Sequence, residues 1–129
     1  MRILLVGAGG VGSAIARIAV RRSFAELLVA DYDQDRAIRA AGPDFTAVQI
    51  DARDEEAVTE LLKAENCDVL LNATDPRFVM PLFRAALAAG TDYLDMAMSL
   101  SHRPRGCTTR GPATRAAPRR PSRNPGSWP

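Results

Sequence analysis

The chain has few of the residues that build metal centres, disulfide frameworks or membrane spans. Its 129 residues include two cysteines, Cys67 and Cys107, and one histidine, His102, with no ligand-like spacing among them. This scarcity argues against a disulfide framework and a zinc site. No run approaches the roughly 18 consecutive apolar residues of a membrane span. Met1 stands directly before an apolar run, which leaves no room for a signal peptide. We therefore expect a cytoplasmic protein without a membrane partner.

The last 28 residues lack acidic and large aliphatic side chains altogether. Residues 102–129 contain seven arginines and six prolines, and no Asp, Glu, Val, Ile, Leu, Met or Phe. Residues 1–101 carry 10 Lys+Arg and all 15 Asp+Glu, so a net charge of −5 precedes a tail of +7. A segment that cannot bury apolar surface does not offset its chain entropy. The sequence therefore predicts a folded domain over 1–101 and a disordered Arg/Pro-rich tail over 102–129.

Two explanations of this tail are open. Arg, Pro, Ala and Gly make up 19 of its 28 positions, and GC-rich codons encode these types, which favours a truncated or frameshifted reading of a longer gene. A basic tail can instead contact nucleic-acid phosphates. Apart from Trp128, however, the tail has no aromatic side chain on which a base could stack. Nucleic acid is therefore the less favoured partner.

A glycine-rich motif follows the first apolar run. Residues 3–6 predict a buried parallel strand, and residues 7–12 spell G-A-G-G-V-G before a helix over 11–22. In such a G-x-G-x-x-G motif the first glycine permits a tight turn, the second admits a pyrophosphate, and the third lets helix and strand pack closely. The phosphates would bind free N–H groups at the start of the helix. These positions are the predicted cofactor-binding residues Gly7, Gly9, Gly10, Val11 and Gly12.

The spacing of apolar residues in this helix predicts which of its faces is buried. Val11, Ala14, Ile15 and Ile18 recur at helical spacing, so we expect them to pack on the sheet.

An acidic residue ends the second predicted strand, residues 27–30. Asp31 lies 19 residues after Gly12, close to the spacing of about 20 at which the dinucleotide fingerprint places an acid on the ribose. The alternative is a simple connecting turn with Asp31 as a solvated charge. A carboxylate here would repel the 2′-phosphate of NADP unless a nearby arginine, such as Arg36, offsets it. With Tyr32 in the adjacent position, the sequence predicts NAD as the cofactor and NADP as the alternative.

Strands and helices keep alternating beyond this point. Further helices are predicted over 34–41, 54–65 and 81–89, and further strands over 45–50, 69–72 and 93–98. Pro81 is expected at the first position of its helix, where a missing N–H costs nothing. Such alternation predicts an α/β fold, a Rossmann-type doubly wound parallel sheet of about five strands.

Further candidate residues follow the third and fourth predicted strands. Asp51 and Ala52 stand where the adenine edge lies in such sheets, and Asn72, Ala73 and Thr74 stand beside the topological switch point. Asp51 as a solvated helix-entry acid and Asn72 as a turn cap are equally open alternatives. Within residues 1–101 no His, Cys or Lys lies beside a partner that would make a catalytic pair, so the catalytic residues stay unknown.

Several of these segments together resemble the saccharopine dehydrogenase-like family, specifically its N-terminal NAD(P)-binding domain. The more specific part is Asn72-Ala73, a helix begun by Pro81, and the run A-G-T-D-Y-L-D over 89–95. The resemblance covers about residues 1–101. It implies an NAD(P)-dependent oxidoreductase that acts at the C–N bond of amino-acid-derived secondary amines. It also implies that a larger substrate domain normally follows, so this chain is expected to bind the cofactor without turnover and to meet its substrate only when that domain is supplied.

The alternative function is a regulatory nucleotide-binding module without catalysis, which shares the strand–glycine–helix–Asp opening. The exposed edge of the fifth strand is expected to favour self-association.

Overall fold

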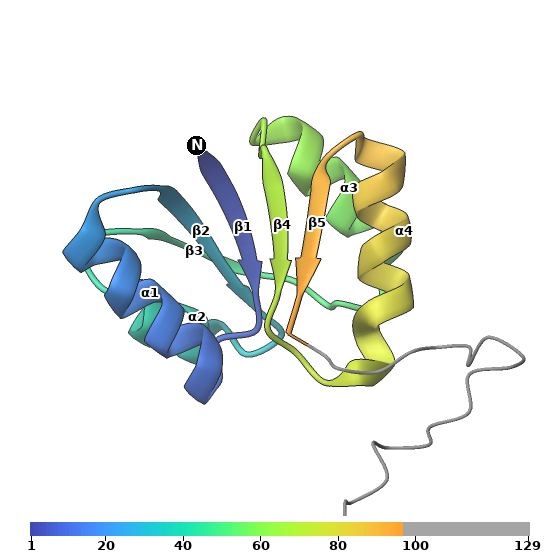
Figure 1. Ribbon diagram of the computed structural model, residues 1–129. Coiled ribbons are helices and arrows are strands. Elements are labelled where there is room, and N and C mark those ends of the chain that lie inside the picture. Colours follow the sequence, from blue (N-terminus) through green and yellow to red (C-terminus); the bar gives the residue numbers. More distant parts are fainter. Residues whose placement is uncertain (97–129) are drawn as a thin grey trace, which may run out of the picture. The chain divides into compact units, whose positions relative to one another are not determined.

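The computed structural model describes residues 1–96 (Figure 1). Strands and helices alternate along them: β1 (Arg2–Val6), α1 (Gly10–Arg22), β2 (Glu26–Asp31), α2 (Gln34–Ala41), β3 (Thr46–Gln49), α3 (Glu55–Ala64), β4 (Val69–Asn72), the 3-10 turn η1 (Pro76–Phe78), α4 (Val79–Ala89) and β5 (Asp92–Asp95). The predicted tail over 102–129, and the end of the fifth predicted strand beyond residue 96, lie outside the described residues.

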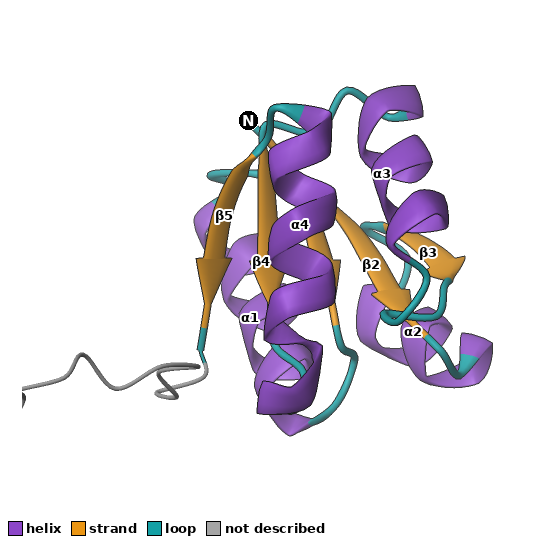
Figure 2. Cartoon of the chain, turned by 90° about the vertical axis from the view of Figure 1, so that its right-hand side faces the viewer, coloured by secondary structure: helices purple, strands orange, loops and turns teal. Residues whose placement is uncertain are grey.

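The five strands form one parallel sheet in the order β3-β2-β1-β4-β5. Alternate residues of β1 belong to two separate hydrophobic cores. Leu4 and Val6 lie in the core on one face of the sheet, and Ile3 and Leu5 lie in the core on the other. Helices α3 and α4 cover the first face, and α1 and α2 lie on the second (Figures 1 and 2). The predicted doubly wound α/β fold is confirmed.

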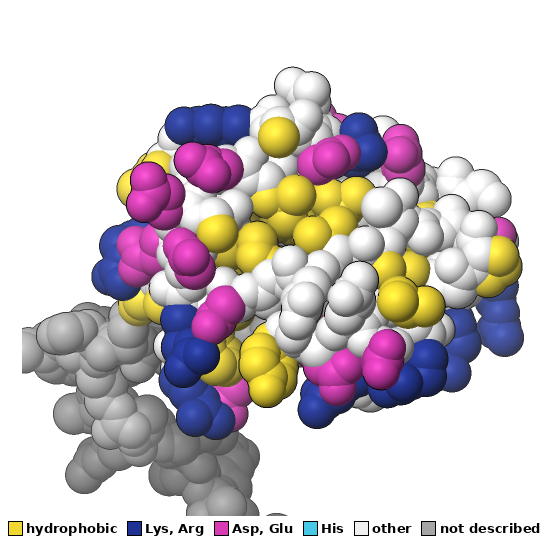
Figure 3. Space-filling view, turned by 180° about the vertical axis from the view of Figure 1, so that it is seen from behind, with side chains coloured by type: hydrophobic (Ala, Val, Ile, Leu, Met, Phe, Trp, Pro, Cys, Tyr) yellow, Lys and Arg dark blue, Asp and Glu magenta, His cyan; other side chains and the backbone are white. Residues whose placement is uncertain are grey.

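Helices α3 and α4 lie side by side on their face of the sheet. Arg84 of α4 forms an ion pair with Glu55 of α3, which lowers the pKa of that carboxyl below its ordinary value. Seen from behind, the molecule carries side chains of both charge signs around an apolar centre (Figure 3). Among the helices of residues 1–96, none is long and apolar enough to cross a membrane.

The predicted buried face of α1 is wrong. Val11 and Ile18 are exposed and Ile15 is half-buried, whereas Gly12, Ala16 and Ala19 make the buried stripe. Small side chains at positions i, i+4 and i+7 let the helix axis approach the strands closely. The larger side chains then lie on the flank of the helix.

The fourth helix also begins earlier than predicted. It starts at Val79, two residues before Pro81, and the turn η1 leads into it. Asp75 caps η1 by accepting a hydrogen bond from the N–H of Arg77 at 3.0 Å. Pro81 is tolerated within the first turn because the N–H groups there have no intrahelical acceptor.

Candidate functional site

A cavity of about 390 Å³ opens at the carboxyl ends of β1, β2, β3 and β4. In the strand order, β2 and β3 lie on one side of β1, and β4 and β5 lie on the other side. Parallel sheets of this kind bind ligands at the point where the strand order reverses in this way. Eight of the predicted site residues line it: Gly7, Gly9, Asp31, Tyr32, Asp51, Ala52, Ala73 and Thr74. Residues from four different strand ends therefore meet in one place.

The four glycines of the loop after β1 fall into two pairs. Gly7 has φ +102°, and a Cβ atom there would lie 2.8 Å from the carbonyl oxygen of Ala73. A Cβ atom on Gly12 would lie 1.8 Å from the carbonyl oxygen of Gly7. At Gly9 and Gly10, by contrast, a Cβ atom would meet nothing within 4 Å. Packing thus requires glycine at the outer two positions, while the inner two face open space.

The N-terminus of α1 beside this loop has no side-chain cap. Gly9 is its N-cap residue, and the first turn contains no acidic residue. The turns that begin α2, α3 and η1 differ, because Asp33, Asp54 and Asp75 accept hydrogen bonds from their backbone N–H groups. The first N–H groups of α1, from Gly10, Val11 and Gly12, directly follow Gly9, which lines the cavity, and belong to the positive end of the helix dipole. This arrangement suits an anionic group.

Asp31 connects the glycine loop to the end of β2. One carboxylate oxygen accepts the N–H of Ala8 at 2.7 Å, and the other accepts the N–H of Asp33 at 2.9 Å. The residue is buried but lines the cavity. Each carboxylate oxygen can accept more than one hydrogen bond, so a ribose hydroxyl could still bind there.

Asn72 lies behind the cavity wall. It is 1% exposed, and its side-chain oxygen accepts hydrogen bonds from the N–H and the hydroxyl of Thr74 at 2.9 and 2.6 Å. Its amide nitrogen donates to the hydroxyl of Tyr93 in β5 at 3.0 Å. Burial raises the pKa of the Tyr93 phenol. Asn72 therefore makes the contacts of a turn cap, and it positions Thr74, which does line the cavity.

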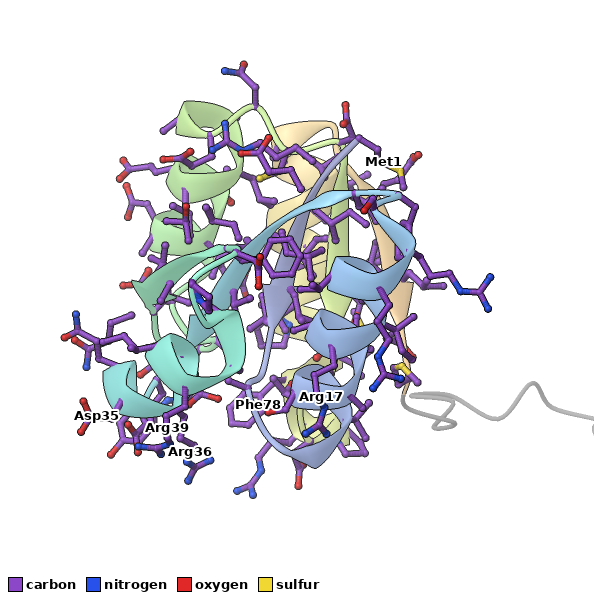
Figure 4. The ribbon with its side chains drawn as sticks, turned by 90° about the vertical axis from the view of Figure 1, so that its left-hand side faces the viewer. Met1, Arg17, Asp35, Arg36, Arg39 and Phe78 are labelled. Atoms are coloured by element: carbon purple, nitrogen blue, oxygen red, sulfur yellow. The ribbon has the colours of Figure 1, made fainter. Side chains whose placement is uncertain are left out.

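The rim of the cavity carries charges that are already paired. Asp51 and Arg53 form an ion pair at 2.7 Å, and hydrogen bonds from Arg53 lower the pKa of Asp51 to about 2. Arg36 lies 3.5 Å from Asp33, which also caps α2. In Figure 4, Arg36 and Phe78 lie at the same end of the sheet, away from Met1.

Some lining residues were not predicted as site residues. Phe78 and Asp75 come from the segment after β4, and Ile50 and Arg53 flank the predicted pair Asp51 and Ala52. The carboxyl ends of parallel strands share one edge of the sheet. The residues that follow the predicted fourth strand could therefore have been predicted to line the site, Asp75 and Phe78 among them. Of the predicted residues, Gly10, Val11 and Gly12 do not line the cavity; they form the first turn of α1, directly after Gly9, which does line it.

Comparison with known proteins agrees with the resemblance found in the sequence. The sequence model of the family described as saccharopine dehydrogenase NADP binding domain matches residues 3–120, which extends beyond the predicted end of the resemblance at about residue 101. The curated carboxyaminopropylagmatine dehydrogenase of Synechocystis is 35% identical over 102 residues, which are 74% of this chain and 25% of that protein. The chain thus spans about a quarter of the length of this relative.

Solved structures agree on the fold. Saccharopine dehydrogenase (L-Glu forming) from Saccharomyces cerevisiae superposes with a TM-score of 0.70 at 21% identity, covering 78% of this chain and 22% of the yeast chain. A UDP-glucose-4-epimerase from Stenotrophomonas maltophila, solved with bound NAD, gives a TM-score of 0.61 at 17% identity, covering 74% of this chain and 36% of the epimerase. At these identities the likeness concerns the fold alone.

Proposed function

Since the chain belongs to the saccharopine dehydrogenase NADP binding domain family, and is thus the NAD(P)-binding domain of a saccharopine dehydrogenase-like oxidoreductase, we propose how it holds the cofactor. The pyrophosphate binds the uncapped N-terminus of α1 over Gly9, and the adenosine half lies toward Asp31, Tyr32 and Ala52. The observation that carries this proposal is the contrast within the loop: Gly7 and Gly12 are needed for packing, whereas Gly9 lines the cavity with open space beside it.

The variant Gly9→Val tests this placement without disturbing the fold. Gly9 has φ −72°, which valine adopts, and its Cβ would meet no other atom within 4 Å. We expect NADH binding, followed by fluorescence titration, to weaken at least tenfold because the valine occupies the space proposed for the pyrophosphate. Ala64→Val is the control, since Ala64 lies at an exposed position of α3 and does not line the cavity. Equal affinities of Gly9→Val and the unaltered chain would refute the placement.

We further propose that NAD is preferred over NADP. The charged groups that line the cavity are Asp31, Asp51 and Asp75 against Arg36 and Arg53. Both arginines already pair with a neighbouring aspartate. A 2′-phosphate would therefore approach a net negative rim, and at about 4 Å a single unscreened repulsion amounts to about 4 kcal/mol at an effective dielectric of about 20.

Competitive titration with the two cofactors measures this preference. The double variant Asp31→Ser, Tyr32→Arg removes the carboxylate and adds a cation, so it should narrow or reverse the NAD preference. The control is Asp35→Ser, which removes a carboxylate from the exposed side of α2, outside the cavity. Tighter binding of NADP by the unaltered chain would contradict the preference without affecting the placement of the pyrophosphate.

For the whole enzyme, we propose the chemistry that its family resemblance implies, which is oxidoreduction at the C–N bond of an amino-acid-derived secondary amine. Among residues 1–96, those that line the cavity include no histidine, lysine or cysteine that could exchange a proton with such a substrate. Binding of NADH with no turnover by the 129-residue chain is the expected result, and steady oxidation of saccharopine-like amines by this chain would overturn it. That the chain is a truncated or frameshifted reading of a longer gene, and that the protein is cytoplasmic, remain predictions from the sequence.

A further inference from the structure

Within the described residues 1–96, the β4–β5 half of one face of the sheet has no helix over it. On the face that α1 and α2 share, the buried cluster draws on β1 and β2, while Val69 and Leu71 of β4 are only half-buried. Leu94 of β5 is 59% exposed, although it pairs in register with Leu71. Figure 1 shows β4 and β5 with no helix in front of them, beside α1. The opposite face of the same two strands is covered by α4 (Figure 2).

The flank of α1 extends this apolar surface. The other flank faces α2, since Arg17 and Val20 line a groove together with residues of α2. The side of α1 turned away from α2 carries Val11, Ile15 and Ile18, of which Ile15, like Leu71, packs against the buried cluster of this face. We name this surface the bare step; it consists of Val11, Ile15 and Ile18 on its wall and Val69, Leu71, Leu94 and Met96 on its floor.

The charges at the two parts of the bare step are opposite. Helix α1 carries Arg17, Arg21 and Arg22 and no acid, and β5 carries Asp92 and Asp95 and no base. Within residues 1–96, neither Arg22 nor Asp92 forms an ion pair. Asp92 alternates with Tyr93 along the strand, so it lies on the same face as Leu94.

We propose that a second copy of this chain occupies the bare step. In each copy a helix ridge stands beside an open strip of sheet, so the surface is complementary to itself. A two-fold axis along the strands places α1 of each copy over β4 and β5 of the other and preserves the direction of the helix. The C-terminal turn of α1, with Arg22, then lies at the end of β5 where Asp92 begins the strand.

Two observations favour this occupant. Residues 102–129 contain no Val, Ile, Leu, Met or Phe, and residues 97–101 add only Met98 and Leu100, so residues 97–129 offer no stripe of large aliphatic side chains to cover the floor. Edge-to-edge pairing of two β5 strands in full antiparallel overlap would set Asp92 of each copy opposite Asp95 of the other. Like charges directly opposite each other oppose strand pairing. Self-association is therefore assigned to the face of the sheet rather than to its edge.

Sedimentation equilibrium of the 129-residue chain tests the proposal, with a closed dimer as the expected species. Leu94→Lys should weaken dimerisation at least tenfold, because it places a charge on the apolar floor. Leu87→Lys is the matched control: Leu87 is 70% exposed on α4, on the covered side of the sheet, and its replacement should leave the dimer unchanged. Both positions are exposed, so both variants should keep the circular dichroism spectrum of the unaltered chain.

Charge exchange tests the orientation. Arg22→Asp and Asp92→Arg should each weaken the dimer, and the double variant should restore it, because the two exchanged charges meet again. A monomer at 100-fold the concentration used for binding studies, open-ended oligomers, or equal effects of Leu94→Lys and Leu87→Lys would overturn the proposal. Since Leu94 and Leu87 lie outside the cavity, NADH binding by the two variants should stay unchanged, which separates this proposal from that of the cofactor site.

Discussion

The candidate site has an inner part, which is the cavity wall together with the residues packed behind it, and a rim that is open to solvent. In the inner part, Gly7 and Gly12 leave no room for a side chain, and Asp31 and Asn72 are buried with hydrogen bonds to the two strand-end loops. On the rim, Gly9 faces open space and Tyr32 is 71% exposed. The contacts of the inner part therefore hold the two loops in place, and the rim is accessible to a ligand.

This difference separates residues that share one sequence motif. Gly7, Gly9 and Gly12 all belong to the G-x-G-x-x-G pattern, yet only Gly9 could accept a side chain without a clash. Substitutions of the inner part should lower the free energy of unfolding, and those at Asp31, which also lines the cavity, should change binding as well. Substitutions of the rim should change binding or titration alone. The following variants test that division, beginning with the largest effect.

Gly12→Ala should lower the free energy of unfolding by about 3 kcal/mol, at the upper end of ordinary overpacking costs. The reason is the 1.8 Å separation between the new Cβ atom and the carbonyl oxygen of Gly7, which forces the helix away from the strand. Urea denaturation followed by circular dichroism measures the change. Gly10→Ala, whose Cβ meets no atom within 4 Å, is the control and should stay within about 0.5 kcal/mol. Similar midpoints for the two variants would mean that the loop is not held by packing.

Asn72→Ala should cost about 2 to 3 kcal/mol. It leaves the N–H and hydroxyl of Thr74 without their shared acceptor, and the hydroxyl of Tyr93 without its donor, around a residue that is 1% exposed. Tyr93→Phe removes the last of these contacts and should cost about 1 kcal/mol. Thermal and urea unfolding of both variants measure the two losses, and a Tyr93→Phe loss as large as that of Asn72→Ala would contradict the assigned contacts.

Tyr32→Ala should leave the free energy of unfolding within about 0.5 kcal/mol of that of the unaltered chain, because the side chain is exposed. If the adenosine half of the cofactor lies against this ring, the affinity for NADH should fall about three- to tenfold, the usual worth of an aromatic contact. Calorimetric titration measures it. Ile38→Ala on α2, exposed but outside the cavity, is the control. Unchanged affinity of Tyr32→Ala would exclude Tyr32 from the site.

Arg53→Gln should change the titration of Asp51 and little else. Arg53 lowers the pKa of Asp51 to about 2, so its loss should return the pKa toward the ordinary value of 3.8. Because the pKa is lower in the folded chain than in the unfolded chain, the pair stabilises the fold above about pH 4 and loses this effect as the pH falls toward 2. Carbon NMR of the carboxyl group across acid pH measures the shift. An unchanged midpoint would show that the pair does not form in solution.

Local sequence determined the parts of the fold that depend on neighbouring residues. The helix over 34–41 and the strand over 69–72 have the predicted bounds, because Asp33 caps the helix, Gly42 ends it at φ +59°, and the strand is a short apolar run. The prediction of α4 from Pro81 was wrong because a proline in the first turn is compatible with several starting residues. The capped turn at Asp75 to Phe78 decides which one is used.

The sequence alone determined the class of fold, the glycine loop and the acidic residue that follows it, since these depend on spacing along the chain. Only the tertiary structure decided which residues of α1 are buried, because Val11 and Ile18 are apolar yet face a strip of sheet without a helix over it. It also decided the contacts of Asn72, whose amide nitrogen bonds to Tyr93, 21 residues away. Periodicity states which residues share one side of an element; what that side meets depends on the strand order and on the neighbouring elements.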